Sequence, residues 1–306
     1  MPEISAARVP PDRMPAERMT VRRMRFPYAD PAEAHWNKAR PEFSQIVNAG
    51  SLAMPFLEPY MIETMKKAKE RITDPQLLKD VDLYIAQEAT HFRQHQQWNK
   101  RLADVGYACI APHEAQLKQD YDAFATKRSF TFNIAYAEGF EAMGLTLGHM
   151  LVEDREYLFK GADPAVTSMI LWHFVEEIEH KTVTYDVFKA LDGRYTWRIY
   201  GLAYATGHIF YRTWQAYRQL LMEDGRWHHV SNRLKLYGLL GRMFRKLLPR
   251  LARILKPSYD PREVEDPAWT KEWSRQHREG AATFGELDTT RLSAPAPVPL
   301  PVQQAA

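Results

Sequence analysis

Two stretches of the sequence decide the fold: "QEATHFRQH" at residues 87–95 and "EEIEH" at residues 176–180. Each contains a glutamate followed three residues later by a histidine: Glu88 with His91, and Glu177 with His180. Residues three apart lie on the same face of an α-helix, so each pair points in one direction. Both stretches lie among apolar residues, and charged groups are costly to bury unless they are paired or bound to a metal. The two pairs therefore predict helices that meet around a metal site.

The rest of the chain also indicates helices. Glycine is scarce, with 14 in 306 residues, and no long alternation of β-branched residues is present. Helices are predicted at about 57–72, 76–105, 130–159, 163–191, 197–223 and 230–254. We expect an all-α protein in which the first four helices form a ferritin-like four-helix bundle and the last two form a C-terminal helical extension.

Composition divides the chain into four parts. Residues 1–29 are arginine-rich and contain no apolar run of the signal-peptide type, so a flexible basic arm is expected. The bundle is expected at 30–192 and the extension packed on it at 193–280. Residues 281–306 are rich in proline and alanine, which predicts a disordered tail.

Charge and cysteine content exclude several classes. The formal charge of +3 does not indicate a nucleic-acid partner. Cys109 is the single cysteine, which excludes an intramolecular disulfide framework and a cysteine-based zinc cluster. A structural cysteine in a reducing, cytoplasmic compartment is expected.

Two more glutamates complete the set of candidate ligands, Glu58 in "PFLEPY" and Glu138 in "AYAEGF". One glutamate from each of two helices, with Glu-x-x-His from each of two others, is the ligand set of a dinuclear carboxylate site. Two nearby cations need bridging anions, and oxygen with imidazole ligands suits iron or manganese. Two divalent metals are predicted, with iron favoured and manganese the alternative. Their ligands are bridging Glu88 and Glu177, and terminal Glu58, Glu138, His91 and His180.

The number of residues between each glutamate and the turn joining its helix to its neighbour tests whether two glutamates lie at the same level. The first pair of helices meets this test better than the second. Glu58 and Glu88 lie about 15 and 13 residues from the turn between their helices, so both reach the same level. Glu138 and Glu177 lie about 23 and 14 residues from theirs, which is a poorer match.

Neighbouring residues leave alternatives open. Glu176 is an alternative to Glu177, although the spacing of three favours Glu177. His95 and His173 lie one turn from a predicted ligand, and each is an extra ligand, a hydrogen-bond partner of one, or an ordinary polar contact. Glu141 has the same ambiguity beside Glu138. If the reaction needs a general base, the candidates are Glu141, Glu176 and His95.

Several motifs resemble the bacterial family of predicted metal-dependent hydrolases, within the ferritin-like superfamily. They are "PFLEPYMIETM", "QEATHFRQHQQWN", "AEGFEAMG", "WHFVEEIEHKTVTYDVF" and "LKPSYDP", and they span about residues 50–261. The resemblance implies a metal-dependent hydrolase, in which a metal-activated water attacks an ester or amide. The same carboxylate and histidine ligands are typical of di-iron oxidases. On ligand chemistry we therefore favour O2-dependent oxidation of a small, hydrophobic substrate over hydrolysis. Metal storage or sensing, and a helical interaction protein at a membrane, are the alternatives from other classes.

The last two predicted helices carry a basic amphipathic pattern. Residues 225–259 contain no aspartate or glutamate, whereas basic residues recur between leucines, most densely at 226–256. Such helices lie on anionic membrane surfaces. The favoured interpretation, however, is that they pack on the bundle with a solvated basic face. The alternative is a peripheral position at the inner membrane face, which would make a lipid-like small-molecule substrate more plausible. The oligomeric state is left open.

Overall fold

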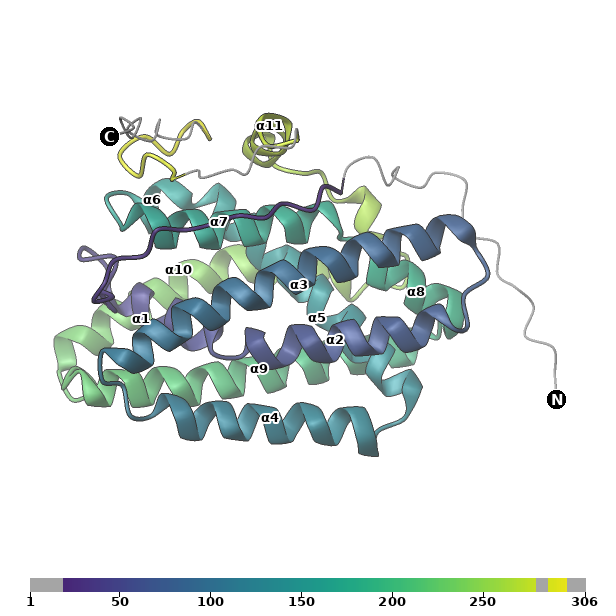
Figure 1. The fold of residues 1–306 in the computed structure, drawn as a ribbon, viewed down its shortest axis with the longest axis horizontal. Coiled ribbons are helices and arrows are strands. Elements are labelled where there is room, and N and C mark those ends of the chain that lie inside the picture. Colours follow the sequence, from purple (N-terminus) through teal and green to yellow (C-terminus); the bar gives the residue numbers. More distant parts are fainter. Residues whose placement is uncertain (1–18, 279–285, 296–306) are drawn as a thin grey trace, which may run out of the picture.

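The computed structural model describes residues 19–278 and 286–295, and they are arranged as a layered helical assembly (Figure 1). The all-α prediction is confirmed. The remainder of the predicted arm, residues 1–18, and the ends of the predicted tail lie outside the described residues.

The predicted helices are present in the predicted order, and the described residues form three further helices, at 41–51, 110–127 and 268–276, that were not predicted. They are α1 (Pro41–Ser51), α2 (Met54–Lys69), α3 (Pro75–Asp104), α4 (Ile110–Lys127), α5 (Phe130–Glu153), α6 (Arg155–Phe159), α7 (Pro164–Glu179), α8 (Val183–Leu191), α9 (Tyr195–Glu223), α10 (Val230–Ile254) and α11 (Ala268–Gln276), with a 3₁₀ turn at Pro261–Glu263.

Local sequence signals set where the long helices begin. Asp74, Ser129 and Asp163 precede α3, α5 and α7, and each side chain accepts a hydrogen bond from a backbone N–H of the first turn. Such caps satisfy donors that have no partner within the helix. Two of the predicted helices are divided. The helix predicted at 130–159 appears as α5 and α6, and the one predicted at 163–191 appears as α7, which ends at Glu179, and α8, which begins at Val183.

Helices α2, α3, α5 and α7 surround the interior, with α2 packed on α3 and α5, and α7 packed on α3 and α5. Nearly every residue of α5 is buried, which makes α5 the central helix. Helix α9 covers α5 from the other side. The two cross at glycines: a methyl group on Gly139 would overlap the backbone of Leu202, and one on Gly201 would overlap the carbonyl of Ala135. The backbones of α5 and α9 are therefore in direct contact.

Segments outside the long helices are better packed than the sequence indicated. Residues 19–29 differ from the expected flexible arm, because this part of the chain runs extended along α7 (Figure 1). Alternate side chains are buried there, and Phe26 packs against Trp172. Residues 286–295 differ from the expected disordered tail in the same way, since Leu287 and Leu292 are buried.

Helix α10 packs on α5 and α1. At the end of α5, Asp154 accepts hydrogen bonds from Arg242 and Lys246, and both carboxylate oxygens of Glu153 accept from Arg250. These contacts fix α10 on the bundle through part of its basic face. None of the helices in residues 19–278 and 286–295 is both long and apolar enough to cross a membrane.

Candidate metal centre

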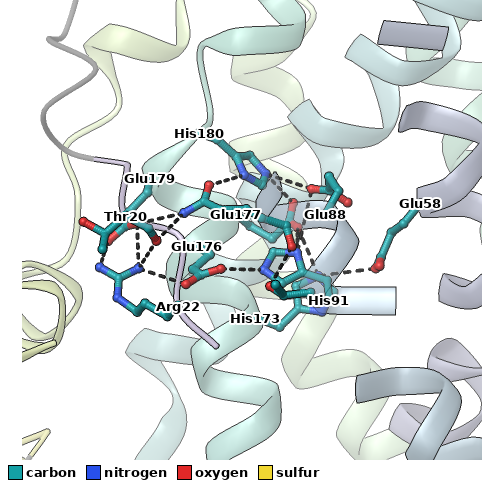
Figure 2. Close-up of polar contacts among 12 residues, drawn as sticks. Thr20, Arg22, Glu58, Glu88, His91, His173, Glu176, Glu177, Glu179 and His180 are labelled. Atoms are coloured by element: carbon teal, nitrogen blue, oxygen red, sulfur yellow. Dashed lines mark hydrogen bonds and ion pairs between the residues drawn. The ribbon is translucent and has the colours of Figure 1, made fainter. Parts of the chain in front are cut away.

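A cluster of acids and imidazoles lies where α2, α3, α5 and α7 meet (Figure 2). All of its members are buried, with side chains 8% exposed or less. They are Glu58 on α2, Glu88, His91 and His95 on α3, Glu141 on α5, His173 and Glu177 on α7, and His180 at the end of α7.

The cluster has two halves that share Glu88. One, here the His91 half, consists of Glu58, Glu88 and His91; the other, the His180 half, consists of Glu88, Glu141, Glu177 and His180. Within each half, one ligand atom from every residue lies within 4.8 Å of the others. Glu177 also groups with His91 and His173, so it reaches both halves. Glu88 and Glu177 are thus placed where bridging carboxylates would be required.

Many polar atoms of the cluster have no hydrogen-bond partner among the described residues. They are both carboxylate oxygens of Glu58 and of Glu88, Oε2 of Glu177, Nδ1 of His91 and Nε2 of His180. Buried polar atoms are normally hydrogen-bonded, because leaving them unpaired costs about 1–3 kcal/mol each. Oxygen and imidazole nitrogen atoms left free in one place fit a hard or intermediate divalent cation.

Each Glu-x-x-His histidine is oriented by its second ring nitrogen. Nε2 of His91 lies 3.0 Å from Glu176, which accepts a hydrogen bond from Arg22 at 2.9 Å (Figure 2). This leaves Nδ1 of His91 facing Glu177 at 3.5 Å. Histidines that ligate metals commonly donate their other N–H to a carboxylate, which fixes the ring and raises its basicity. Glu176 therefore supports His91.

His180 is oriented by an amide instead. Its Nδ1 lies 3.1 Å from the side-chain amide oxygen, Oε1, of Gln87. The amide nitrogen of Gln87 donates to Thr20 and Glu179, so its oxygen accepts from His180. Nε2 of His180 is then the atom that faces the cluster, and it lies 3.3 Å from carboxylate oxygens of Glu141 and Glu177.

A chain of hydrogen bonds determines the tautomers of His95 and His173. Ser51 donates to Asn99 at 2.6 Å, so its hydroxyl oxygen accepts from Nδ1 of His95 at 2.8 Å. Nε2 of His95 is then an acceptor for Nδ1–H of His173, at 2.6 Å. The remaining nitrogen of His173, Nε2, faces Glu177 at 3.0 Å. A proton occupies this contact in the metal-free protein, and a cation could take its place, so His173 is a candidate ligand and His95 is its support.

Burial and mutual repulsion raise the pKa of Glu58 and of Glu88 well above the ordinary value. Burial alone would lower the pKa of His91 and His180, but the carboxylates beside them raise it well above its usual value. Burial alone would raise the pKa of Glu177, but the charge of His180 and hydrogen bonds from neighbouring histidines hold it well below its usual value. Protons thus offset the excess negative charge, and a divalent cation would displace them.

Glu138, predicted as a terminal ligand, lies in none of these groups. Burial raises its pKa to about 8, partly opposed by the charge of Arg198 on α9. Glu141 stands in the cluster instead, one helical turn further along α5, where the hydroxyl of Tyr84 donates to it at 2.8 Å. The cause is the position of the cluster along the axis of α5. Glu141 is level with Glu177, whereas Glu138 lies one helical turn, about 5 Å, further back along the axis.

The three candidate bases differ in their surroundings. Glu141 belongs to the His180 half, Glu176 is hydrogen-bonded to Arg22 and His91, and both nitrogens of His95 are in hydrogen bonds.

Three residues that support the cluster were not predicted from the sequence: Arg22, Tyr84 and Gln87. Arg22 is separated from Glu176 by 154 residues, so no local pattern could have connected them.

An apolar cavity of about 440 Å³ adjoins the cluster. Its inner end is formed by Ser51, His95, His173 and Glu177, and its walls are apolar side chains of α1, α5, α7, α9 and α10. At its outer end lie Phe210, Trp214 and Phe244, each about two-fifths exposed. The cavity therefore leads from the surface between α9 and α10 to the His173 side of the cluster.

The model of a protein family described as "predicted metal-dependent hydrolase" matches residues 20–265. The chain belongs to this family. No curated protein and no solved structure matches the chain.

Proposed function

We propose that this protein is a ferritin-like enzyme with a dinuclear centre, iron favoured over manganese, that oxidises a small apolar substrate with O2. One observation carries the proposal: the apolar cavity ends on His173 and Glu177, two members of the ligand cluster. A substrate in that cavity would present its hydrocarbon to the centre rather than to solvent.

Each residue of the cluster has a role in this proposal. Glu58 and His91 would hold one ion and Glu141 and His180 the other, with Glu88 and Glu177 between them. His173, oriented by His95, adds a nitrogen on the cavity side. Two ferrous ions at such a centre would supply two of the four electrons needed to reduce O2 to water, and oxidation of the substrate would supply the other two. The apolar walls exclude water from the reacting end of the cavity.

Hydrolysis is the second candidate, favoured by the family's description. It requires an activated water and a polar ester or amide beside the ions. Of the candidate bases, Glu141 is the one within the cluster whose pKa, raised by burial and by the nearby Glu177 carboxylate to about 7, suits proton transfer near neutrality. The nearly all-carbon cavity favours oxidation over this alternative.

Metal loading and oxygen exposure separate the candidates. The protein is loaded anaerobically with Fe(II), its metal content is measured, and O2 is admitted while near-UV absorption and O2 uptake are followed. Rapid O2 uptake that Glu88→Ala abolishes, with the variant still folded, supports oxidation. Metal binding with no response to O2, together with metal-dependent turnover of an ester or amide panel, assigns hydrolysis. A protein that binds no metal contradicts both.

A further inference from the structure

Helix α10 carries two apolar stripes. The inner one packs on the bundle and consists of Leu236, Leu239, Met243, Leu247 and Ile254. The other is exposed and consists of Val230, Leu234, Tyr237, Phe244, Leu248 and Leu255, each at least 41% exposed. The spacings of three, four and seven place the exposed stripe on one face of the helix. A continuous exposed apolar stripe of this kind marks a contact surface.

The mouth of the cavity lies on the same surface. Phe210 and Trp214 of α9 and Phe244 of α10 both line the cavity and are exposed to solvent. Tyr211, 58% exposed, lies beside them on α9. The exposed apolar surface and the entrance to the site are therefore one surface, here called the α9–α10 face.

Cations without an acidic partner flank this face. Arg242, Lys246 and Arg250 are bound to the end of α5. By contrast, Lys235, Arg245 and Lys256 are exposed and form no ion pair with any described residue. Residues 225–259 contain no acid that could neutralise them. Free positive charge beside exposed aromatic and aliphatic side chains is complementary to an anionic lipid surface.

We propose that the α9–α10 face lies on an anionic phospholipid bilayer and that the cavity takes one hydrocarbon chain of a bilayer lipid. What happens to that chain at the cluster rests on the proposed function; docking and uptake do not. The headgroup stays at the mouth beside the free cations, and the chain extends between α5 and α9 toward His173. The cavity of about 440 Å³ lies within the range of about 300–1,000 Å³ that is usual for small-molecule sites.

A second copy of the chain fits the face less well. In a two-fold dimer the same surface contacts itself, so the free cations of α10 would meet their own copies. No acid of α10 would offset that repulsion, because the helix contains none. An anionic bilayer meets the same cations with opposite charge.

Vesicle flotation tests the docking. Metal-free protein is mixed with phosphatidylcholine vesicles with or without phosphatidylglycerol, and the bound fraction is measured. We expect binding only to the anionic vesicles, reduced on the order of tenfold by Arg245→Glu and by Leu248→Glu. Lys79→Glu and Val105→Glu make matching changes at exposed positions of α3 and its end, and should bind like the unaltered protein. Equal binding by all variants, or no binding, overturns the proposal. The proposal is also overturned if light scattering shows a dimer and Leu248→Glu converts it to a monomer.

Gly50→Phe tests the cavity. Gly50 lines it, and a Cβ added there would meet nothing within 4 Å, so the ring would enter the open space without a clash at the backbone. We expect this variant to lose binding of a fluorescent long-chain fatty acid while its vesicle binding is retained, and Gly50→Ala to keep both. Fatty-acid binding that Gly50→Phe leaves unchanged overturns chain uptake.

Both assays use metal-free protein, so their outcome is independent of the reaction. Docking and chain uptake without O2 uptake by the Fe(II) protein would refute the proposed oxidation and leave this inference standing. O2 uptake without vesicle binding would refute this inference alone.

Discussion

The two halves of the cluster differ in what supports their histidine. His91 is held by the Glu176 carboxylate, itself fixed by Arg22, whereas His180 is held by the neutral amide of Gln87. They also differ in surroundings, since His91 stacks on His173, which lines the cavity, and His180 lies against Tyr84. A carboxylate partner makes an imidazole a stronger ligand than an amide does. Two helices with the same Glu-x-x-His spacing thus place their histidines in two different environments.

The largest expected effect comes from removing what the halves share. Glu88→Ala and Glu177→Ala should each abolish dinuclear binding, because each takes an anion from both positions. Metal per chain, measured by atomic emission after equilibration with Fe(II) under anaerobic conditions, checks this. Circular dichroism controls for folding. Unchanged metal content in both folded variants would rule out the cluster as a metal centre.

The next comparison uses two glutamates on one helix. Glu141→Gln should empty the His180 position while the His91 position still binds, because Glu141 belongs only to the His180 half. Glu138→Gln, one turn away, should bind as much metal as the unaltered protein. The reverse result would restore Glu138 as the ligand that the sequence indicated. Metal titration of both variants under one set of conditions decides between them.

The supports of the two histidines should differ measurably. Glu176→Gln is expected to weaken metal binding by about 10–100-fold, the usual cost of losing an outer-shell carboxylate. Gln87→Leu, the matched change on the other side, should cost less because it removes a neutral acceptor. Competition titrations with a chelator of known affinity give both values. Equal losses would mean that the halves are equivalent.

The smallest effect concerns an acid outside both halves. The pKa of Glu138 is raised by burial to about 8, so the folded state holds a proton that the unfolded chain releases near pH 4.5. Stability from this group is therefore fully present below about pH 4.5 and falls as pH rises to about 8. Glu138→Gln should be more stable than the unaltered protein at pH 9 by roughly 1–3 kcal/mol, and not at pH 4. Urea unfolding of the metal-free proteins measures the difference in free energy of unfolding. A difference that does not grow with pH would contradict a raised pKa for Glu138.

The helices and the two Glu-x-x-His pairs could be predicted because both depend on local spacing. Three residues along a helix bring Glu88 and His91 to one face whatever surrounds them. Asp163 caps α7 for an equally local reason. The choice between Glu138 and Glu141 depends on how far α5 slides along its neighbours, which no spacing within α5 reveals. The unequal distances of Glu138 and Glu177 from their turn were the one available signal.

Other parts of the site depend on contacts between distant segments. Arg22 reaches Glu176 only because residues 19–29 run along α7, held by alternate side chains such as Phe26. That segment was expected to be a flexible arm, because it is rich in arginine, which is usually exposed to solvent. The tautomer of His173 depends on Ser51 at the end of α1, a helix that was not predicted.

The crossing of α5 and α9 at Gly139 and Gly201 has a consequence for substrate size. The two backbones touch there, so α9 cannot approach α5 any closer. Phe210, on the same helix and at the cavity mouth, lies nine residues from Gly201, about 14 Å along the axis. A side chain at either glycine would push α9 away from α5, and Phe210 at the cavity mouth would move with its helix. A single methyl group at Gly139 or Gly201, which belong to neither half of the cluster, is therefore expected to change the width of the cavity mouth.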